Sequence, residues 1–309
     1  MGDTVIFKHS GNAGDIIAAM AGIRQICEKL GRKATLLLRL NTPAFYYSGA
    51  PQHPVQDARG QQVMLNRKQY DMLKPLLLAQ DYVAGVGIYT GQKVMVDLDR
   101  IRGEVAVGMP NTQIQHWYGY AFPDMWTDTS EAWMGAPGMG GDSRKILINR
   151  TSRYVNENLD FHFLKAYADR GELLFTGLEV ERDEFCERWG YSVELLKVGD
   201  FLDLAGHLAG ARFVLCNQSF VYNLCEALKV PRVLEICTWA PNCTPTGAGA
   251  AAYMNQAGLE YWFGQMVERT QTPVQGVIGF EQEEKKYSRA ELINWLGNVS
   301  NGFDDDEER

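Results

Sequence analysis

The chain alternates short apolar runs with longer segments in which apolar residues recur every three or four positions. The runs are typical of buried strands, and the three-to-four spacing is typical of helices that bury one face. In the first half, strands are expected at 4–7, 34–38, 86–89 and 93–97, and helices at 15–30 and 66–82. In the second half, strands are expected at 145–149, 173–177, 212–216 and 232–236, and helices at 161–168, 179–189, 201–209, 219–229 and 288–296. This alternation predicts parallel sheets covered by helices on both faces.

A glycine-rich segment, residues 135–142, divides the pattern near the middle of the chain. It contains nothing that would form a core, so it is predicted to be a linker and a hinge. The predicted organisation is an α/β protein with two Rossmann-like, doubly wound domains, residues 1–134 and 143–286. A final helix at 287–299 and an acidic, disordered tail at 300–309 are expected to follow.

The first expected strand ends in a turn that contains two glycines and leads directly into a helix. Gly11 and Gly14 permit backbone angles that a Cβ would forbid. The first turn of the helix leaves backbone N–H groups, at the positive end of the helix dipole, available to an anion. Asp15 lies near the helix start, where its carboxylate either caps the helix or acts as a general base. Residue type alone favours the cap.

Three expected strands of the second half end in polar residues suited to a phosphate or a sugar. They are followed by Arg150, Thr151 and Arg153, by Gly177 and Glu179, and by Asn217, Gln218 and Ser219. Arginine holds phosphate oxygens through two parallel N–H groups, and a serine N-cap marks a helix start that attracts anions. The alternatives are ordinary surface arginines and ordinary helix caps. For Glu179 the cap is favoured over a ribose contact.

Composition narrows the class of protein further. The six cysteines are scattered without a Cys-x-x-Cys pair, which favours free thiols in a reducing compartment and predicts a cytoplasmic protein. A net charge of −8 argues against a protein that coats nucleic acid. The longest apolar runs are too short to span a bilayer, so no stable membrane insertion is expected. No Asp-x-Asp pattern indicates a metal held by carboxylates, and no cofactor is expected.

Two stretches resemble the heptosyltransferase-like glycosyltransferases of glycosyltransferase family nine, which have the GT-B fold. They are HSGNAGDIIAA at 9–19 and FVLCNQS at 213–219, the latter continuing to EALKVP at 226–231. The resemblance implies two Rossmann-like domains that face each other across a cleft, with the final helix crossing back to the first domain. It also implies a metal-independent, inverting transfer of a sugar from a nucleotide-sugar donor to an acceptor hydroxyl.

The resemblance assigns roles to the residues of the turns. Asp15 is implied as the base, in a turn formed by Gly11, Asn12 and Gly14. The residues that follow the strands of the second half are implied to hold the donor. The heptosyltransferases usually have Asp-Thr followed by histidine in the late motif, where this chain has Gln218, Ser219 and Asn223. The resemblance therefore does not imply that the donor sugar is a heptose.

The acceptor and two other functions stay open at this point. A glycan or a lipopolysaccharide core is favoured as the acceptor over a modified nucleobase. A sugar-nucleotide epimerase uses the same fold without an acceptor, and a binding module would retain the nucleotide-sugar site without turnover.

Overall fold

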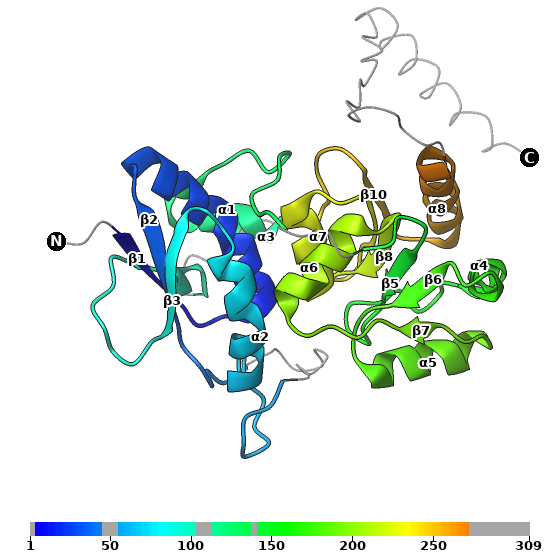
Figure 1. Ribbon diagram of the computed structural model, residues 1–309, viewed down its shortest axis with the longest axis horizontal. Helices are drawn as coiled ribbons and strands as arrows, with labels where there is room; N and C mark the ends of the chain where they lie inside the picture. The colour runs from blue at the N-terminus through cyan, green and yellow to red at the C-terminus, as the bar shows by residue number, and fades with distance from the viewer. Residues whose placement is uncertain (1–3, 45–54, 103–112, 137–140, 272–309) are drawn as a thin grey trace, which may run out of the picture. The chain divides into compact units, whose positions relative to one another are not determined.

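The computed structural model describes residues 4–44, 55–102, 113–136 and 141–271 (Figure 1). The predicted final helix at 287–299 and the predicted tail at 300–309 lie outside these residues. So do residues 137–140 of the expected linker and residues 272–286 of the expected second domain. Both sheets described below belong to one compact unit, residues 1–272.

The first sheet has four parallel strands in the order β3-β2-β1-β4. Its strands are β1 (Thr4–His9), β2 (Lys33–Leu38), β3 (Val83–Ile88) and β4 (Val96–Asp97). Its helices are α1 (Ala13–Leu30), α2 (Arg67–Leu78) and α3 (Ile114–Ala121), with 3-10 helices η1 (Leu98–Arg102) and η3 (Pro123–Met125). Helix α1 ends at a glycine cap, because Gly31 adopts the left-handed conformation with φ of 61°.

The second sheet has six parallel strands in the order β10-β9-β8-β5-β6-β7. Its strands are β5 (Ile146–Asn149), β6 (Leu173–Phe175), β7 (Glu194–Leu195), β8 (Phe213–Asn217), β9 (Arg232–Glu235) and β10 (Ala250–Tyr253). Its helices are η4 (His162–Leu164), α4 (Lys165–Asp169), α5 (Glu179–Trp189), α6 (Phe201–Gly210), α7 (Phe220–Leu228) and α8 (Gln256–Gln271). All residues of β5, β8 and β9 are buried, as expected for central parallel strands.

The predicted pair of parallel α/β sheets is therefore confirmed, with differences at the level of single elements. The strand expected at 93–97 is reduced to the two residues of β4. The helix expected at 161–168 is split into η4 and α4. The sequence pattern did not reveal β7, β10, α3 or α8. β10 reads Ala-Ala-Ala-Tyr, a composition with little preference for strands, and it is a strand because it pairs with β9.

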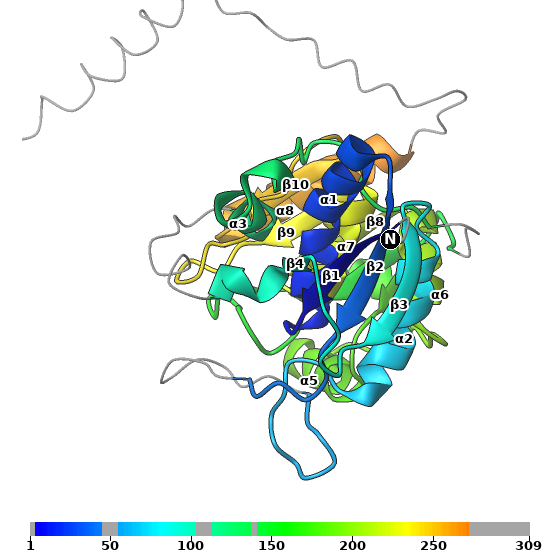
Figure 2. The same ribbon diagram turned by 90° about the vertical axis from the view of Figure 1, so that its left-hand side faces the viewer.

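Helix α1 of the first sheet packs against helix α7 of the second (Figure 2). One hydrophobic core contains Ile16 and Met20 of α1 together with Leu224 and Ala227 of α7. This contact explains why α1 is buried around almost its whole circumference in its first eleven residues. The packing brings the carboxyl-end turns of β1 and β8 into one neighbourhood, because each turn leads into one of the two helices. None of the described helices is both long and apolar enough to cross a membrane.

Candidate active site

A chain of buried hydrogen bonds supports the turn after β1. The Gly11 N–H donates to His9 Nδ1 over 2.8 Å, so the imidazole proton lies on Nε2. That nitrogen donates to Tyr118 Oη over 2.7 Å, and Tyr118 donates to the Asp15 carbonyl oxygen over 2.9 Å. Burial lowers the pKa of His9 and raises the pKa of Tyr118 well above its usual value, so both side chains stay neutral. These hydrogen bonds fix the position of Asp15 on the first turn of α1.

Gly11 is required by close packing at this turn. A Cβ placed on Gly11 would lie 2.5 Å from His9 Cε1 and 2.8 Å from Asp15 Oδ2. Such contacts are too short for any side chain to be accepted without movement of the imidazole or the carboxylate. The glycine therefore lets the Asp15 carboxylate lie directly over the turn.

Asp15 does not cap α1, which corrects the expectation that residue type favoured. The N-cap is Asn12, whose Oδ1 accepts from the Asp15 N–H over 3.0 Å. The Asp15 side chain is 4% exposed, and its Oδ2 pairs with Arg102 at the end of η1. Because Asn12 supplies the cap, the Asp15 carboxylate is not needed for it. That carboxylate can act in catalysis or in the ion pair with Arg102.

A neighbouring acid, Asp99, is fully engaged in holding the same turn. Its carboxylate accepts from the Ser10 N–H over 2.7 Å and from Ser10 Oγ over 2.5 Å, and it pairs with Lys8 at 3.0 Å. Burial disfavours the charge on Asp99, but the hydrogen bonds from Ser10 and Lys8 outweigh it and lower the pKa. Asp99 thus has a structural task, and Asp15 is the better candidate for a base.

Helix α7 begins with a serine cap, as its sequence predicted. Ser219 Oγ accepts from the Tyr222 N–H over 3.2 Å and donates to Asn149 Oδ1 over 2.6 Å. Asn149 Nδ2 in turn donates to the Thr176 carbonyl oxygen over 2.6 Å. The first turn of α7 contains no acidic residue, so the positive end of its dipole is not compensated by its own side chains. This helix start is suited to an anion.

The first turns of α1 and α7 meet at Gly14. A Cβ on Gly14 would lie 3.1 Å from Asn223 Nδ2 and 3.2 Å from Asn12 Oδ1. Asn223 Nδ2 donates to the Ser219 carbonyl oxygen over 3.1 Å. Within the described part of the chain, Asn223 Oδ1 is buried and has no hydrogen-bond partner. A buried acceptor in this state calls for a donor, such as a hydroxyl group of a bound molecule.

Asn217 and Gln218, predicted to contact a donor, hold the loops on either side of α7. Asn217 is fully buried, and its Oδ1 accepts from the Thr151 N–H over 3.1 Å while its Nδ2 donates to the carbonyl oxygens of Thr151 and Arg153. Gln218 Oε1 accepts from the Cys237 N–H over 2.5 Å, and its Nε2 donates to the Ala240 carbonyl oxygen over 2.8 Å. We therefore expect both amides to act on a ligand through the loops that they position.

The two arginines after β5 differ in their surroundings. Arg150 is buried against Glu235 at the end of β9, with Nε 2.9 Å from Oε2, so its charge is compensated inside the protein. Glu235 Oε1 also accepts from the Asn156 N–H over 2.6 Å, which ties the loop after β5 to β9. The Arg153 guanidinium lies 5.0 Å from the centre of the Tyr154 ring. Of the two, Arg153 is the better candidate for a phosphate contact.

The turn after β6 holds Gly177 in a conformation that favours glycine, with φ of 152°. The side chain that caps α5 is Glu181, whose Oε2 accepts from the Leu178 N–H over 2.9 Å. Glu179 lies in the first turn of α5, exposed, with Oε1 3.6 Å from Arg182. Glu179 thus lies where its charge complements the dipole of α5, as favoured, while the capping hydrogen bond comes from Glu181. A contact of Glu179 with a ribose stays a prediction.

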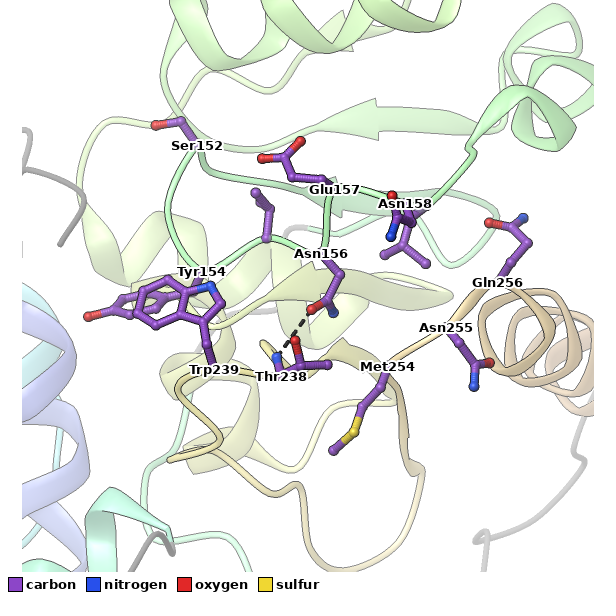
Figure 3. Close-up of a pocket in the computed structure, with 12 residues that line it drawn as sticks. Ser152, Tyr154, Asn156, Glu157, Asn158, Thr238, Trp239, Met254, Asn255 and Gln256 are labelled. Carbon is purple, nitrogen blue, oxygen red and sulfur yellow. Dashed lines mark hydrogen bonds between the residues drawn. The ribbon is translucent and has the colours of Figure 1, made fainter. Parts of the chain in front are cut away.

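A pocket of about 450 Å³ opens at the carboxyl ends of β5, β9 and β10 (Figure 3). We call it the aromatic pocket, and residues 152, 154–159, 238–239 and 254–256 line it. Tyr154 and Trp239 form its most prominent feature, with ring centres 5.3 Å apart and planes inclined by 33°. The sequence analysis did not select these residues, although Trp239 lies shortly after the predicted strand 232–236 and could have been found by a search of the residues that follow each strand.

Arg102 and Tyr118 were also missed, and no local signal marks them. They lie 87 and 103 residues from Asp15 and reach it only in the folded chain. Of the predicted residues, the structure brings Gly11, Asn12, Gly14 and Asp15 into one turn. That turn meets α7 at Asn223. Thr151 and Arg153 are hydrogen-bonded through their backbones to Asn217, which ends the strand before α7.

The two parallel α/β sheets, with helix α1 of one packed against helix α7 of the other, form a GT-B fold. No model of a protein family matches the sequence, and no curated protein matches it either. Solved structures do match in their fold. E. coli heptosyltransferase WaaC with ADP matches with a TM-score of 0.56 and 10% identity, over 85% of this chain and 99% of that one.

Two further structures match to a similar extent. A glycosyl transferase family 9 protein from Veillonella parvula matches with a TM-score of 0.52 and 10% identity, over 86% of this chain and 89% of that one. Heptosyltransferase TibC in complex with ADP-D-beta-D-heptose matches with a TM-score of 0.56 and 11% identity, over 88% of this chain and 79% of that one. At these identities the likeness establishes the fold.

Proposed function

We propose that this protein is an inverting glycosyltransferase that moves a sugar from a nucleotide-sugar donor to an acceptor hydroxyl, with Asp15 as the general base and without a metal ion. The observation that supports it most is the meeting of two unlike helix starts at Gly14 and Asn223. One start carries a carboxylate and the other attracts an anion. The fold is shared with heptosyltransferases that have been seen with ADP and with an ADP-heptose.

In the proposed reaction, the acceptor hydroxyl gives its proton to the Asp15 carboxylate as its oxygen attacks the anomeric carbon of the donor. The bond from that carbon to the phosphate oxygen breaks on the opposite face, so the configuration is inverted. The nucleoside diphosphate leaves with the bonding electrons. The α7 dipole and Arg153 stabilise its charge, and Asn223 Oδ1 accepts a hydrogen bond from a hydroxyl of the transferred sugar.

Arg102 has a defined place in this scheme. It is the cation that faces the Asp15 carboxylate, and its side chain is 44% exposed, against 4% for Asp15. An acceptor hydroxyl that approaches Asp15 therefore enters beside Arg102. We place the reaction in the cytoplasm, where six cysteines, each a free thiol in the structure, stay reduced. We favour a glycan or a lipopolysaccharide core as the acceptor.

Thermal unfolding in the presence of a panel of nucleotide sugars tests the proposal. A donor at a hundredfold excess over its dissociation constant stabilises a protein by about 2.7 kcal/mol, which corresponds to a rise in Tm of roughly 5 °C or more. At least one nucleotide sugar should produce this rise, and the same compound should be consumed when candidate acceptors are added.

Product analysis distinguishes the other functions of the fold. Conversion of the sugar nucleotide without any acceptor would identify an epimerase instead. Binding without any turnover would identify a binding module. If no nucleotide sugar changes Tm, the proposal is wrong.

A further inference from the structure

Trp133, which lies in the segment between the two sheets, is hydrogen-bonded to both α1 and α7. Its indole Nε1 donates to the Ile17 carbonyl oxygen of α1 over 3.1 Å, and its backbone N–H donates to the Ala227 carbonyl oxygen of α7 over 3.1 Å. The residue is 4% exposed and belongs to the hydrophobic core that contains both helices. One buried residue therefore bridges the helix with the proposed base and the helix with the proposed anion site.

This bridge lies one helical turn beyond the point where the two helices meet. The first turns approach each other at Gly14 and Asn223. Ile17 and Ala227, which Trp133 joins, follow these residues by one turn of each helix. A single contact would let the helices pivot about it, but two contacts a turn apart also fix the angle between them.

Side chains of the first sheet hold the same segment. Tyr82 Oη donates to the Trp133 carbonyl oxygen over 2.8 Å. Gln80 exchanges two hydrogen bonds with the backbone of Gly135, its Nε2 donating to the carbonyl oxygen over 3.1 Å and its Oε1 accepting from the N–H over 2.8 Å. Both side chains immediately precede β3. The backbone of residues 133–135 is thereby fixed to the first sheet.

A buried acid of the second sheet holds the other end of the segment. The Glu226 side chain is 1% exposed, and its Oε1 accepts from Lys229 Nζ over 2.5 Å and from the Thr246 N–H over 3.1 Å. Thr246 Oγ1 donates to the Thr129 carbonyl oxygen over 2.6 Å, and Lys229 Nζ lies 5.0 Å from the centre of the Trp133 ring. We call residues 129–135 the clasp segment, because its two ends and its middle are bonded to both sheets.

The described residues of the predicted hinge at 135–142 are packed as well. Gly135 is held by Gln80 as above. At the other end, a Cβ on Gly141 would lie 2.5 Å from the Cα of Gly210, the last residue of α6, so the two backbones are in direct contact. Neither of these residues has the freedom that a hinge requires.

We propose that the clasp segment holds the starts of α1 and α7 at a preset separation, with Trp133 as its positioning residue. Asp15, two residues before Ile17, is then aligned with the donor site before any ligand binds, without closure of the two sheets about a hinge. Because misplacement of reacting groups by about 1 Å costs roughly 10²-fold in rate, the clasp acts on turnover and not on donor affinity. This inference rests on the proposed function, since it states how the base and the donor site of that reaction are kept in register.

The variant Trp133→Phe tests the proposal, because it keeps an aromatic ring and removes the indole N–H. The kcat should fall roughly ten- to hundredfold with the nucleotide sugar that thermal unfolding selects. The Kd of the matching nucleoside diphosphate, measured by calorimetry, should stay at its wild-type value. Calorimetry also counts the binding sites, so kcat is expressed per folded site and partial unfolding of the variant does not lower it.

Trp117→Phe is the matched control, because Trp117 Nε1 is buried and has no hydrogen-bond partner among the described residues. It should retain the wild-type kcat. Thr246→Val keeps the side-chain shape, releases the Thr129 end of the segment and should lower kcat by a smaller factor, so it carries the test if Trp133→Phe does not fold. Equal kcat in Trp133→Phe and Trp117→Phe, or a loss of donor affinity in step with kcat, would overturn the proposal.

A distance measurement tests the preset geometry without any turnover. Spin labels are attached through Asp81→Cys beside the first sheet and Glu268→Cys on α8, both exposed positions, and the wild type without these cysteines controls for labelling of native thiols. Double electron–electron resonance should give one distance that the four common ribonucleoside diphosphates leave unchanged, and a broader distribution when Trp133→Phe and Thr246→Val are combined. A distance that shifts on nucleotide binding would show closure and overturn the clasp. If no nucleotide sugar binds or reacts, the proposed function fails, while these distances still decide whether the clasp exists.

Discussion

Helices α1 and α7 begin in the same way but present opposite charges. Each follows a parallel strand and a short polar turn, and each is capped by a small polar side chain, Asn12 or Ser219. The first turn of α1 carries Asp15, whereas the first turn of α7 carries no acid. The backbone therefore sets up two similar positive helix ends, and one side chain decides that α1 offers a carboxylate while α7 attracts an anion.

The supports of the two helix starts differ as well. The start of α1 is supported by a series of hydrogen bonds that runs from Gly11 through His9 and Tyr118 to the Asp15 carbonyl oxygen. This series includes the titratable imidazole of His9. Beneath α7, Ser219 bonds to Asn149, and neither group titrates near neutral pH. In the proposed function, the same turn geometry serves a base at α1 and an anion site at α7, and a few side chains make the difference.

The largest effect is expected at α1. Asp15→Asn keeps the shape and the burial of the side chain but removes the proposed general base, so kcat should fall by about 10²- to 10⁴-fold. The donor affinity should stay near the wild-type value, because we propose that the donor binds at the start of the other helix, α7. Initial rates and calorimetry measure the two quantities.

Asp124→Asn is the control for this prediction. Asp124 is an exposed acidic residue of η3, beside the same sheet, and it pairs with Lys29 at 3.5 Å. It should retain full activity. Full activity in Asp15→Asn would show that the Asp15 carboxylate is not the base, and the proposed difference between the two helix starts would then be wrong.

A smaller effect is expected at α7. Asn223→Asp places a negative charge beside the proposed diphosphate site and should weaken binding of the nucleoside diphosphate by about ten- to a hundredfold, through repulsion between like charges. Isothermal titration measures the affinity at two salt concentrations, and the loss should be smaller at high salt.

Asn66→Asp makes the same substitution at the N-cap of α2, where Asn66 Oδ1 accepts from the Gln69 N–H over 2.9 Å. It should leave the affinity for the diphosphate unchanged. Unchanged affinity in Asn223→Asp would show that the start of α7 does not hold the anion.

The smallest effect is a pH dependence expected at the start of α1 and not at the start of α7. The pKa of His9 is lowered in the folded protein by burial, so below its usual value of 6.5 the unfolded chain binds a proton that the folded chain does not. Stability should fall as pH is lowered through this range, by about 1.4 kcal/mol per pH unit at most. Urea unfolding between pH 7.5 and 5 measures it.

His9→Gln lacks the titrating group, so the difference in unfolding free energy between wild type and variant should shrink as pH falls. Amide hydrogen exchange shows which part of the protein loses stability on acidification. Protection should decrease at the start of α1 with acidification, but not at the start of α7. A wild type whose stability is flat over this pH range would contradict the neutral, buried assignment of His9.

Features that depend on neighbours along the chain could be predicted from the sequence. The strand–turn–helix order and the cap at Ser219 follow from local preferences, and the structure confirms them. The need for glycine at position 11 was predicted from backbone freedom. The structure attributes it instead to close packing against His9 and Asp15.

The sequence by itself thus determined the two parallel sheets and the positions of the turns that carry the chemistry, because strand and helix periodicity is set by adjacent residues. The tertiary structure decided which side chains remain available in those turns. Arg150 is compensated by Glu235, 85 residues away, and Asp15 is paired with Arg102, 87 residues away. Such partners meet only when β8 and β9 line up beside β5, or when η1 folds back beside β1. The physical reason is that charge compensation and packing act through space, while the preferences that a sequence displays act along the chain.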